Sequence, residues 1–195
     1  MIAKRLFDLV RTDQTRLDEL RREMWEEITA ETSAALGRLE AKHGELVREV
    51  AGKMDERAVL VLFAQLHAEA MKSAARDRLR LMCAAIAGIF TPQIDLEMKS
   101  RIARAITQLQ PSDVICLRRI AGFLADQHVD VARVLSSAVG IDALKNCGCV
   151  SVDAAGEDFS RDPVQTAQPL ELTGVGRALL SFVETWQEGD EVVTA

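Results

Sequence analysis

The chain has 195 residues, with 24 Lys and Arg against 30 Asp and Glu, and so a formal net charge of −6. Hydrophobic residues make up 48% of it, which is enough to build a core and excludes wholesale disorder. Aromatic residues are only 4% and Tyr is absent, so the composition favours helices over a β-sandwich. The acidic balance also argues against a protein that coats nucleic acid without sequence preference.

The amino-terminal segment carries a basic pair and then a short apolar stretch that Asp8 interrupts, which is unlike a signal peptide. No window of about 20 apolar residues occurs, so we expect no membrane span. The four cysteines lack the spacing of a disulfide framework. These features predict a cytoplasmic protein with reduced thiols.

One long helix is predicted from about Thr12 to Gly52, because this segment holds no Pro and its apolar residues recur at steps of eleven. Eleven residues span three helical turns, which keeps these positions in one stripe. A helix of about 40 residues would be near 60 Å long, longer than a compact chain of this size is wide. We therefore expect part of the stripe to pair with a second copy in a homodimer; the alternative is that it folds back on 58–89 of its own chain. The candidate self-association residues are Leu17, Met24, Trp25, Ile28, Ala35, Leu36, Leu39, Leu46, Val47 and Val50.

Further helices complete the predicted amino-terminal bundle. Asp55 is a candidate N-cap for a helix that is apolar on nearly every side through Met71, which predicts a buried helix. The helical pattern continues over 73–89, with or without a break, until Thr91-Pro92 ends it. Asp95 opens another amphipathic helix. Gly37 and Gly44 weaken the long helix and are candidate points of close approach by another backbone.

A boundary near Pro111 divides the chain into a long-helix region (1–109), a carboxy-terminal module (110–187) and a tail (188–195) expected to be loose. The module is predicted to contain, in order, a helix to about Ala125, short helices at 131–139 and 141–146, an apolar strand over 149–152, a polar loop, a strand over 169–172 and a last helix from Gly174 to Trp186.

Two segments of the module carry a family resemblance. They are Ala143-Leu144-Lys145-Asn146-Cys147-Gly148-Cys149-Val150 and Leu170-Glu171-Leu172-Thr173-Gly174-Val175-Gly176-Arg177-Ala178-Leu179-Leu180. Their pattern resembles that of bacterial winged helix-turn-helix proteins. In the first segment a helix ends in Leu and Gly before an apolar pair, and in the second the wing is followed by Leu-Thr and Gly. Gly148 is expected to be left-handed, Thr173 to cap the last helix, and Gly176 to allow close approach to the sheet.

The predicted fold class is therefore mainly all-α, with a long helical hairpin or bundle followed by a winged-helix-like module that holds a small β-hairpin. This organisation is similar to that of uncharacterised bacterial proteins that join a long helical hairpin to such a module.

The resemblance implies DNA binding, whereas the charge of the module argues against it. Residues 109–195 hold six basic and thirteen acidic side chains, a net charge of −7, while the first 108 residues carry +1. The recognition helix implied by the resemblance offers Asp142, Lys145 and Asn146 but no Arg. DNA readers bring several cations to phosphates and base edges. We therefore expect a non-enzymatic adaptor that self-associates and binds a protein partner, and the alternative is a winged-helix transcriptional regulator.

Two arginine pairs lie on helical faces, Arg76 with Arg80 and Arg101 with Arg104. They are candidate contacts for an anion or a partner, and the alternative is a solvated face that pairs with nearby acids.

Neither the cysteines nor the histidines predict a catalytic or metal site. Cys147 and Cys149 are closer than the usual zinc spacing and lack two further ligands, so they are interpreted as small apolar residues. His43, His67 and His128 have no carboxylate or Ser at a spacing that predicts a hydrolytic triad. We expect no enzyme, no metal and no cofactor.

Overall fold

The computed structural model describes residues 14–125, 141–152 and 170–187. The predicted long helix is two helices, α2 (Gln14–His43) and α3 (Glu45–Lys53). The break is at Gly44, whose φ of 54° lies in the left-handed region that glycine adopts without steric cost. A Cβ at Gly37 or Gly44 would meet nothing within 4 Å, so the expectation of close backbone approach at these glycines is wrong.

Three helices follow, α4 (Glu56–Met71), α5 (Arg76–Gly88) and α6 (Leu96–Gln108). Both predicted caps are present, since Asp55 accepts a hydrogen bond from Ala58 N at 3.1 Å and Asp95 accepts one from Met98 N at 2.7 Å. Residues 72–75 separate α4 from α5, so the alternative with a break is the correct one, and the second helix begins at Arg76 rather than Ser73.

The break between α4 and α5 has a local cause. The Ser73 hydroxyl donates to the Glu69 carbonyl at 2.9 Å, and the backbone N–H of Ser73 donates to the Ala70 carbonyl at 3.0 Å. Such bonds tighten the last turn and compete with the helical ladder, which ends the helix.

The remaining elements are α7 (Pro111–Ala125), α9 (Ile141–Asn146), strands β1 (Val150–Val152) and β2 (Leu170–Leu172), and α10 (Gly174–Phe182). The strands pair antiparallel in a two-stranded sheet, with Val150 opposite Leu172. The last helix ends at Phe182, four residues before the predicted end. The predicted helix at 131–139, the polar loop and the tail at 188–195 lie outside the described residues.

Three small-residue predictions for the module are confirmed. Gly148 has a φ of 69°. Thr173 Oγ1 accepts a hydrogen bond from Gly176 N at 3.0 Å and so caps α10. A Cβ at Gly176 would lie 2.1 Å from the Cys149 carbonyl oxygen, so only glycine fits between α10 and β1.

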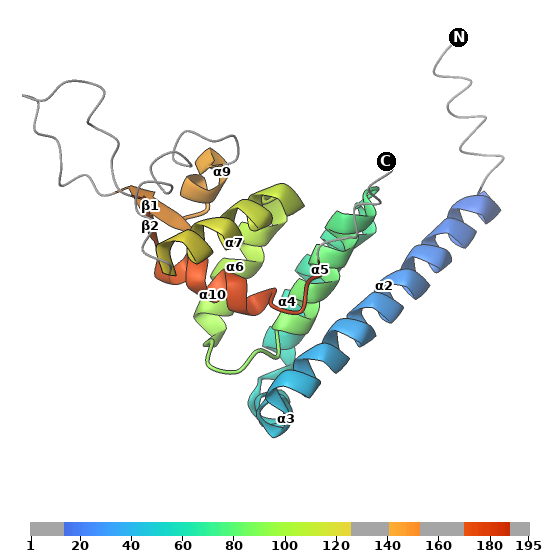
Figure 1. Ribbon diagram of the computed structural model, residues 1–195. Helices are drawn as coiled ribbons and strands as arrows, with labels where there is room; N and C mark the ends of the chain where they lie inside the picture. Colours follow the sequence, from blue (N-terminus) through green and yellow to red (C-terminus); the bar gives the residue numbers. More distant parts are fainter. Residues whose placement is uncertain (1–13, 126–140, 153–169, 188–195) are drawn as a thin grey trace, which may run out of the picture.

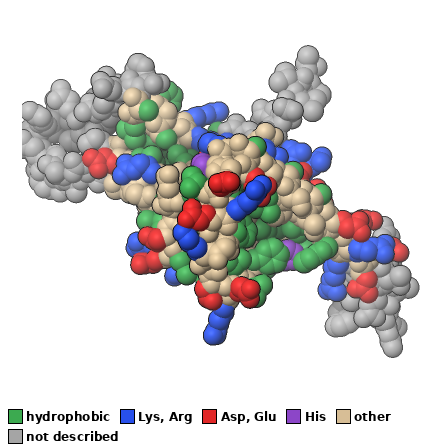
Figure 2. Space-filling view, turned by 90° about the horizontal axis from the view of Figure 1, so that it is seen from below, with side chains coloured by type: hydrophobic (Ala, Val, Ile, Leu, Met, Phe, Trp, Pro, Cys, Tyr) green, Lys and Arg blue, Asp and Glu red, His purple; other side chains and the backbone are tan. Residues whose placement is uncertain are grey.

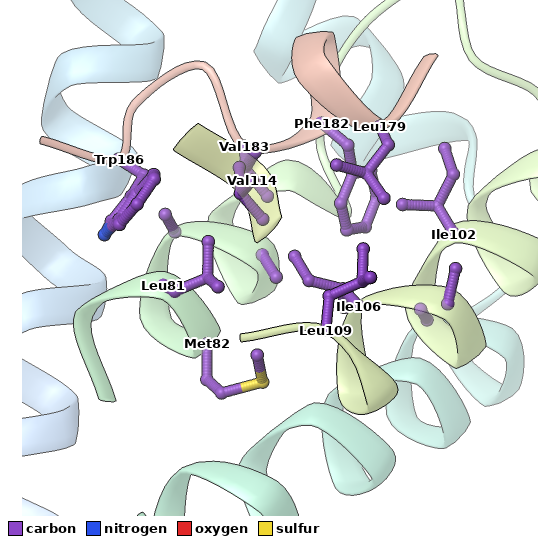
Figure 3. Close-up of a cluster of buried hydrophobic side chains, with 14 of the residues drawn as sticks. Leu81, Met82, Ile102, Ile106, Leu109, Val114, Leu179, Phe182, Val183 and Trp186 are labelled. Carbon is purple, nitrogen blue, oxygen red and sulfur yellow. The ribbon is translucent and has the colours of Figure 1, made fainter. Parts of the chain in front are cut away.

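The fold is mainly all-α, and α5 lies at its centre (Figure 1). The residues from Leu81 to Ile89 are all buried, because α2, α4, α6, α7 and α10 each contact α5. Figure 3 shows the core where side chains of α5 and α6 meet Val114 of α7, Leu179 and Phe182 of α10, and Trp186. The core is thus continuous across residue 109, and the division into a bundle and a module stays a prediction.

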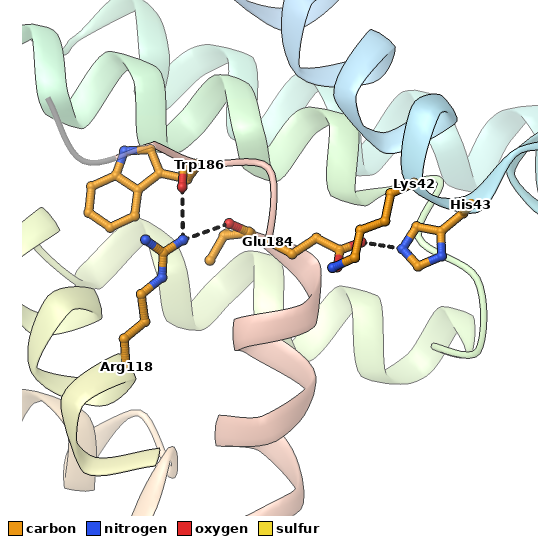
Figure 4. Close-up of polar contacts among 6 residues, drawn as sticks. Lys42, His43, Arg118, Glu184 and Trp186 are labelled. Carbon is orange, nitrogen blue, oxygen red and sulfur yellow. Dashed lines mark hydrogen bonds and ion pairs between the residues drawn. The ribbon is translucent and has the colours of Figure 1, made fainter. Parts of the chain in front are cut away.

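The segment after α10 ties the module to α2. Glu184 bonds both Lys42 and His43 at the end of α2 (Figure 4). Arg38 donates to the Thr185 carbonyl at 3.0 Å. From the other side, Arg118 of α7 donates to the Trp186 carbonyl at 2.9 Å and lies over the Trp186 ring. These contacts hold the segment after α10 between α2 and α7.

Candidate functional site

The predicted self-association stripe divides into a buried half and an exposed half. The guanidinium groups of Arg76 and Arg80 on α5 pair with Glu27 and Glu31 on α2 in the same order along both helices, so α2 and α5 run parallel. The stripe residues that face inward are buried in the same chain and are not available to a second copy, which corrects their assignment to a self-association surface. These residues are Ile28, Ala35, Leu39 and Val47.

The other stripe residues remain at least partly accessible. Trp25 is 50% exposed and Leu46 is 48% exposed, while Met24, Leu36 and Val50 are half-buried. The side chain of Leu17 lies outside the described part of the structure. The alternative prediction, in which the stripe folds onto 58–89 of its own chain, therefore describes one half of it.

The exposed apolar residues of α4 were missed by the sequence analysis, which predicted a buried helix. Leu62, Leu66 and Ala70 face the core, whereas Leu60 is 64% exposed and Val61 is 61% exposed. Residues four apart share one side of a helix, so Leu60, Ala64 and Ala68 form a row with Val61 beside it. We call the surface formed by five exposed residues the α2–α4 face: Trp25, Leu60, Val61, Ala64 and Ala68.

His67 joins the two helices of this face. Its ring packs edge-on against Trp25 with the centroids 4.7 Å apart and stacks on Phe63 at 5.3 Å. Leu60 precedes His67 by two helical turns on the same side of α4, which makes the apolar surface continuous from α4 to α2. Figure 2 shows hydrophobic side chains gathered on the face seen from below.

The imidazole of His67 adds no charge to this surface at neutral pH. Its Nε2 atom is buried and has no hydrogen-bond partner among the described residues. Burial lowers the pKa of His67, because the charged form loses its hydration. The α2–α4 face is therefore an uncharged surface around a neutral ring.

Arg76 and Arg80, the first predicted arginine pair, have partners within the chain. Arg76 lies 3.8 Å from Glu27 and Arg80 lies 3.3 Å from Glu31. The first pair is exposed and the second is partly exposed, and surface pairs contribute about 0–1 kcal/mol each. These ion pairs agree with the alternative interpretation of Arg76 and Arg80, a solvated face that pairs with nearby acids.

The second arginine pair lies on a cavity that brings together two sets of predicted residues. Arg101 and Arg104 of α6 line a cavity of about 360 Å³ together with Asn146 at the end of α9 and Val175 in the first turn of α10. Neither guanidinium has an ion-pair partner within 14–125, 141–152 and 170–187. No pattern in the sequence indicated that α6 supplies cations to the end of α9.

The residues of the predicted recognition helix lie on one side of α9 and differ in exposure. Asp142 and Asn146 are exposed, while Lys145 is half-buried. Asn146 lines the arginine cavity, and α9 is only six residues long. The winged-helix assignment stays a prediction.

The cysteines are buried or half-buried free thiols, as their apolar interpretation predicts. Burial raises the pKa of Cys83 to about 11 and that of Cys149 to about 12, and it also raises the pKa of Cys147. Cys147 Sγ lies 3.7 Å from the Ala105 carbonyl oxygen. Within the described residues no group of three or more His, Cys, Asp or Glu could hold a metal ion.

Comparison with models of protein families, with curated proteins and with solved structures finds no match. Among the described residues, every helix is too short or too polar to cross a membrane. The functional argument therefore depends on the surfaces of this chain alone.

One buried cation also escaped the sequence analysis. Lys99 is only 2% exposed and lies with Ile102 and Ile106 on the buried side of α6. A signal was present, because Lys99 precedes Ile102 by three residues and Ile106 by seven, which places it on the same helical side.

Proposed function

We propose that this protein is a non-enzymatic interaction protein that forms a homodimer through the α2–α4 face and binds a protein partner through its carboxy-terminal module. The observation that carries the proposal is the exposure of Leu60 and Val61, 64% and 61%, on the outward side of a helix whose other side is core. Contiguous apolar surfaces of this kind are a mark of interaction sites on soluble proteins.

A second copy of the chain is the occupant that the chemistry of the face favours. A two-fold interface places the same patch on both subunits, so a charged residue near the axis would oppose its own copy. The α2–α4 face has no charged member between Leu60 and Ala68 on its exposed row, and burial keeps His67 neutral. Completing the burial of Leu60 or Val61 would contribute on the order of 1–2 kcal/mol per side chain.

The module is proposed to bind a protein rather than DNA because of its charge. Residues 109–195 carry a net charge of −7, which repels a nucleic-acid backbone and attracts a basic protein surface. The dimer would present two copies of this acidic module.

The experiment that tests the dimer face is sedimentation velocity of Leu60→Glu/Val61→Glu beside wild type. Both side chains are exposed, so glutamates there leave the core of one subunit intact but place four like charges in the proposed interface. We expect wild type to sediment as a dimer at about 10 µM and the double variant as a folded monomer. The matched control is Leu96→Glu, an exposed leucine on α6 outside the face, which should remain dimeric.

Two results would contradict the dimer proposal. If wild-type protein sediments as a monomer at this concentration, no second copy binds the α2–α4 face. A double variant that stays dimeric shows that the copies meet elsewhere.

The winged-helix DNA-binding regulator is kept as a second candidate because of the arginine cavity. Arg101 and Arg104 lie beside Asn146 without acidic partners among the described residues, and so place two free cations next to the implied recognition helix. Loss of both charges in Arg101→Gln/Arg104→Gln should then abolish a shift of genomic DNA fragments at low salt. The matched control, Arg76→Gln/Arg80→Gln, removes two arginines that pair within the chain and should leave the shift unchanged.

A further inference from the structure

The ammonium group of Lys99 is buried, and no carboxylate of the described residues pairs with it. An ammonium carries three donors, yet the contact the structure gives Lys99 Nζ is the Met54 sulfur at 3.9 Å, a weak acceptor. Asp95 is near enough to favour the charged form electrostatically, but its side chain accepts the cap bond from Met98 N. A buried cation with so little compensation is costly to hold, and it is a position where an anion would be stabilised.

Lys99 lines a cavity of about 320 Å³ that lies between α3, the start of α4 and α6. The half-buried side chains of Val50, Met54 and Ile94 supply an apolar wall. The exposed side chains at the edge, among them Leu96, show that the cavity reaches the surface. The volume is at the lower end of the range for small-molecule sites, which combine apolar walls with a few polar groups.

The acidic residues around this cavity are engaged elsewhere. Glu49 pairs with Lys53 one turn further along α3, and this lysine lowers the pKa of the Glu49 carboxyl. Asp55 caps α4. Lys99 is thus the cation of the cavity without an ion-pair partner among the described residues, while two carboxylates at the edge repel a ligand with several negative charges.

We propose that this cavity binds a small monocarboxylate with an aliphatic body. The carboxylate would accept hydrogen bonds from Lys99 Nζ, and the hydrocarbon would lie against Val50, Met54 and Ile94. One buried ammonium balances one negative charge, and the apolar wall offers no hydrogen-bond partners to a polar ligand body. The site is separate from the α2–α4 face and does not depend on the proposed dimer.

The test is a calorimetric titration of the full-length protein with octanoate, with 1-octanol as the uncharged analogue. Wild type should bind octanoate and bind 1-octanol at least tenfold more weakly. Lys99→Met keeps the length of the side chain but removes the charge, and it should weaken octanoate binding at least tenfold, because a hydrogen bond to a charged group is lost. The matched control is Lys72→Met, an exposed lysine that does not line this cavity, which should bind octanoate within about threefold of wild type.

Lys99→Met should also melt at the same or a higher temperature than wild type without ligand, which separates lost binding from lost folding. If it does not fold, Leu96→Trp fills the edge of the cavity with Lys99 intact and should reduce octanoate binding at least tenfold. The proposal is overturned if wild type does not bind octanoate at an octanoate concentration of about 10 mM, which is above the dissociation constant of any specific site. It is equally overturned if 1-octanol binds as well as octanoate, or if a folded Lys99→Met binds octanoate like wild type.

Discussion

Replacing Leu39 by Ala tests how the eleven-residue stripe is used. The Leu39 side chain is 0% exposed where α2 packs within its own chain, so its truncation should cost about 2–5 kcal/mol of unfolding free energy. For a chain of this size this lowers the melting temperature by roughly 4–20 °C. Leu46 belongs to the same stripe but is 48% exposed, and Leu46→Ala should cost less than about 1.5 kcal/mol.

The assay is urea unfolding followed by circular dichroism, at about 1 µM and about 100 µM protein. If Leu39 is packed within one chain, the difference between Leu39→Ala and wild type is the same at both concentrations. A cost for Leu39→Ala that is no larger than that for Leu46→Ala would refute the reasoning. A cost that appears only at the higher concentration would show that Leu39 contacts a second copy instead.

Further predictions concern a glycine contact, two thiols and one buried amine. Gly176→Ala should lower the free energy of unfolding in urea by about 1–3 kcal/mol, because its Cβ would clash with a carbonyl. Gly122→Ala, at an exposed site in α7 with open space for a Cβ, should raise it by about 0.5–1 kcal/mol. Cys83 and Cys149 have thiol pKa values of about 11 and 12, so little of either thiol is ionised at pH 8. Both should therefore react with a disulfide reagent at pH 8 only in unfolded protein. Mass spectrometry that finds either cysteine labelled within minutes in native protein would contradict this. Burial lowers the pKa of Lys99 in the folded protein below its ordinary value of 10.5. At a pH between the folded and the unfolded pKa, the unfolded chain therefore binds more protons than the folded chain, and the free energy of unfolding should rise with pH. A Lys99→Met variant should lose this rise.

Local features of the fold could be predicted because they depend on a few neighbouring residues. Asp55, Asp95 and Thr173 cap helices as expected, since each side-chain oxygen reaches a backbone N–H three residues ahead. Gly148 has the expected positive φ because a helix ends there and the chain must turn. Such choices are made within one turn of the chain and need no knowledge of the tertiary contacts.

The surfaces could not be predicted, because each depends on which helices meet. The pattern of α4 indicated burial on every side, and nothing in it says that Leu60 faces outward. Gly44 was recognised as a weak point of the long helix, but its positive φ is decided by how α3 departs towards α4. The same holds for Glu184, whose partners Lys42 and His43 are more than 140 residues away in the sequence.

The central claim, self-association through α2 and α4, is tested most directly by the molar mass of wild-type protein in a light-scattering dilution series. We predict a mass near twice 21.4 kDa at about 100 µM, falling towards 21.4 kDa on dilution. Emission of half-exposed Trp25 should shift to the red over the same dilution, since the proposed interface covers its ring. A mass that stays at 21.4 kDa throughout would contradict the account, because the exposed residues of α4 would then have no second copy to cover them.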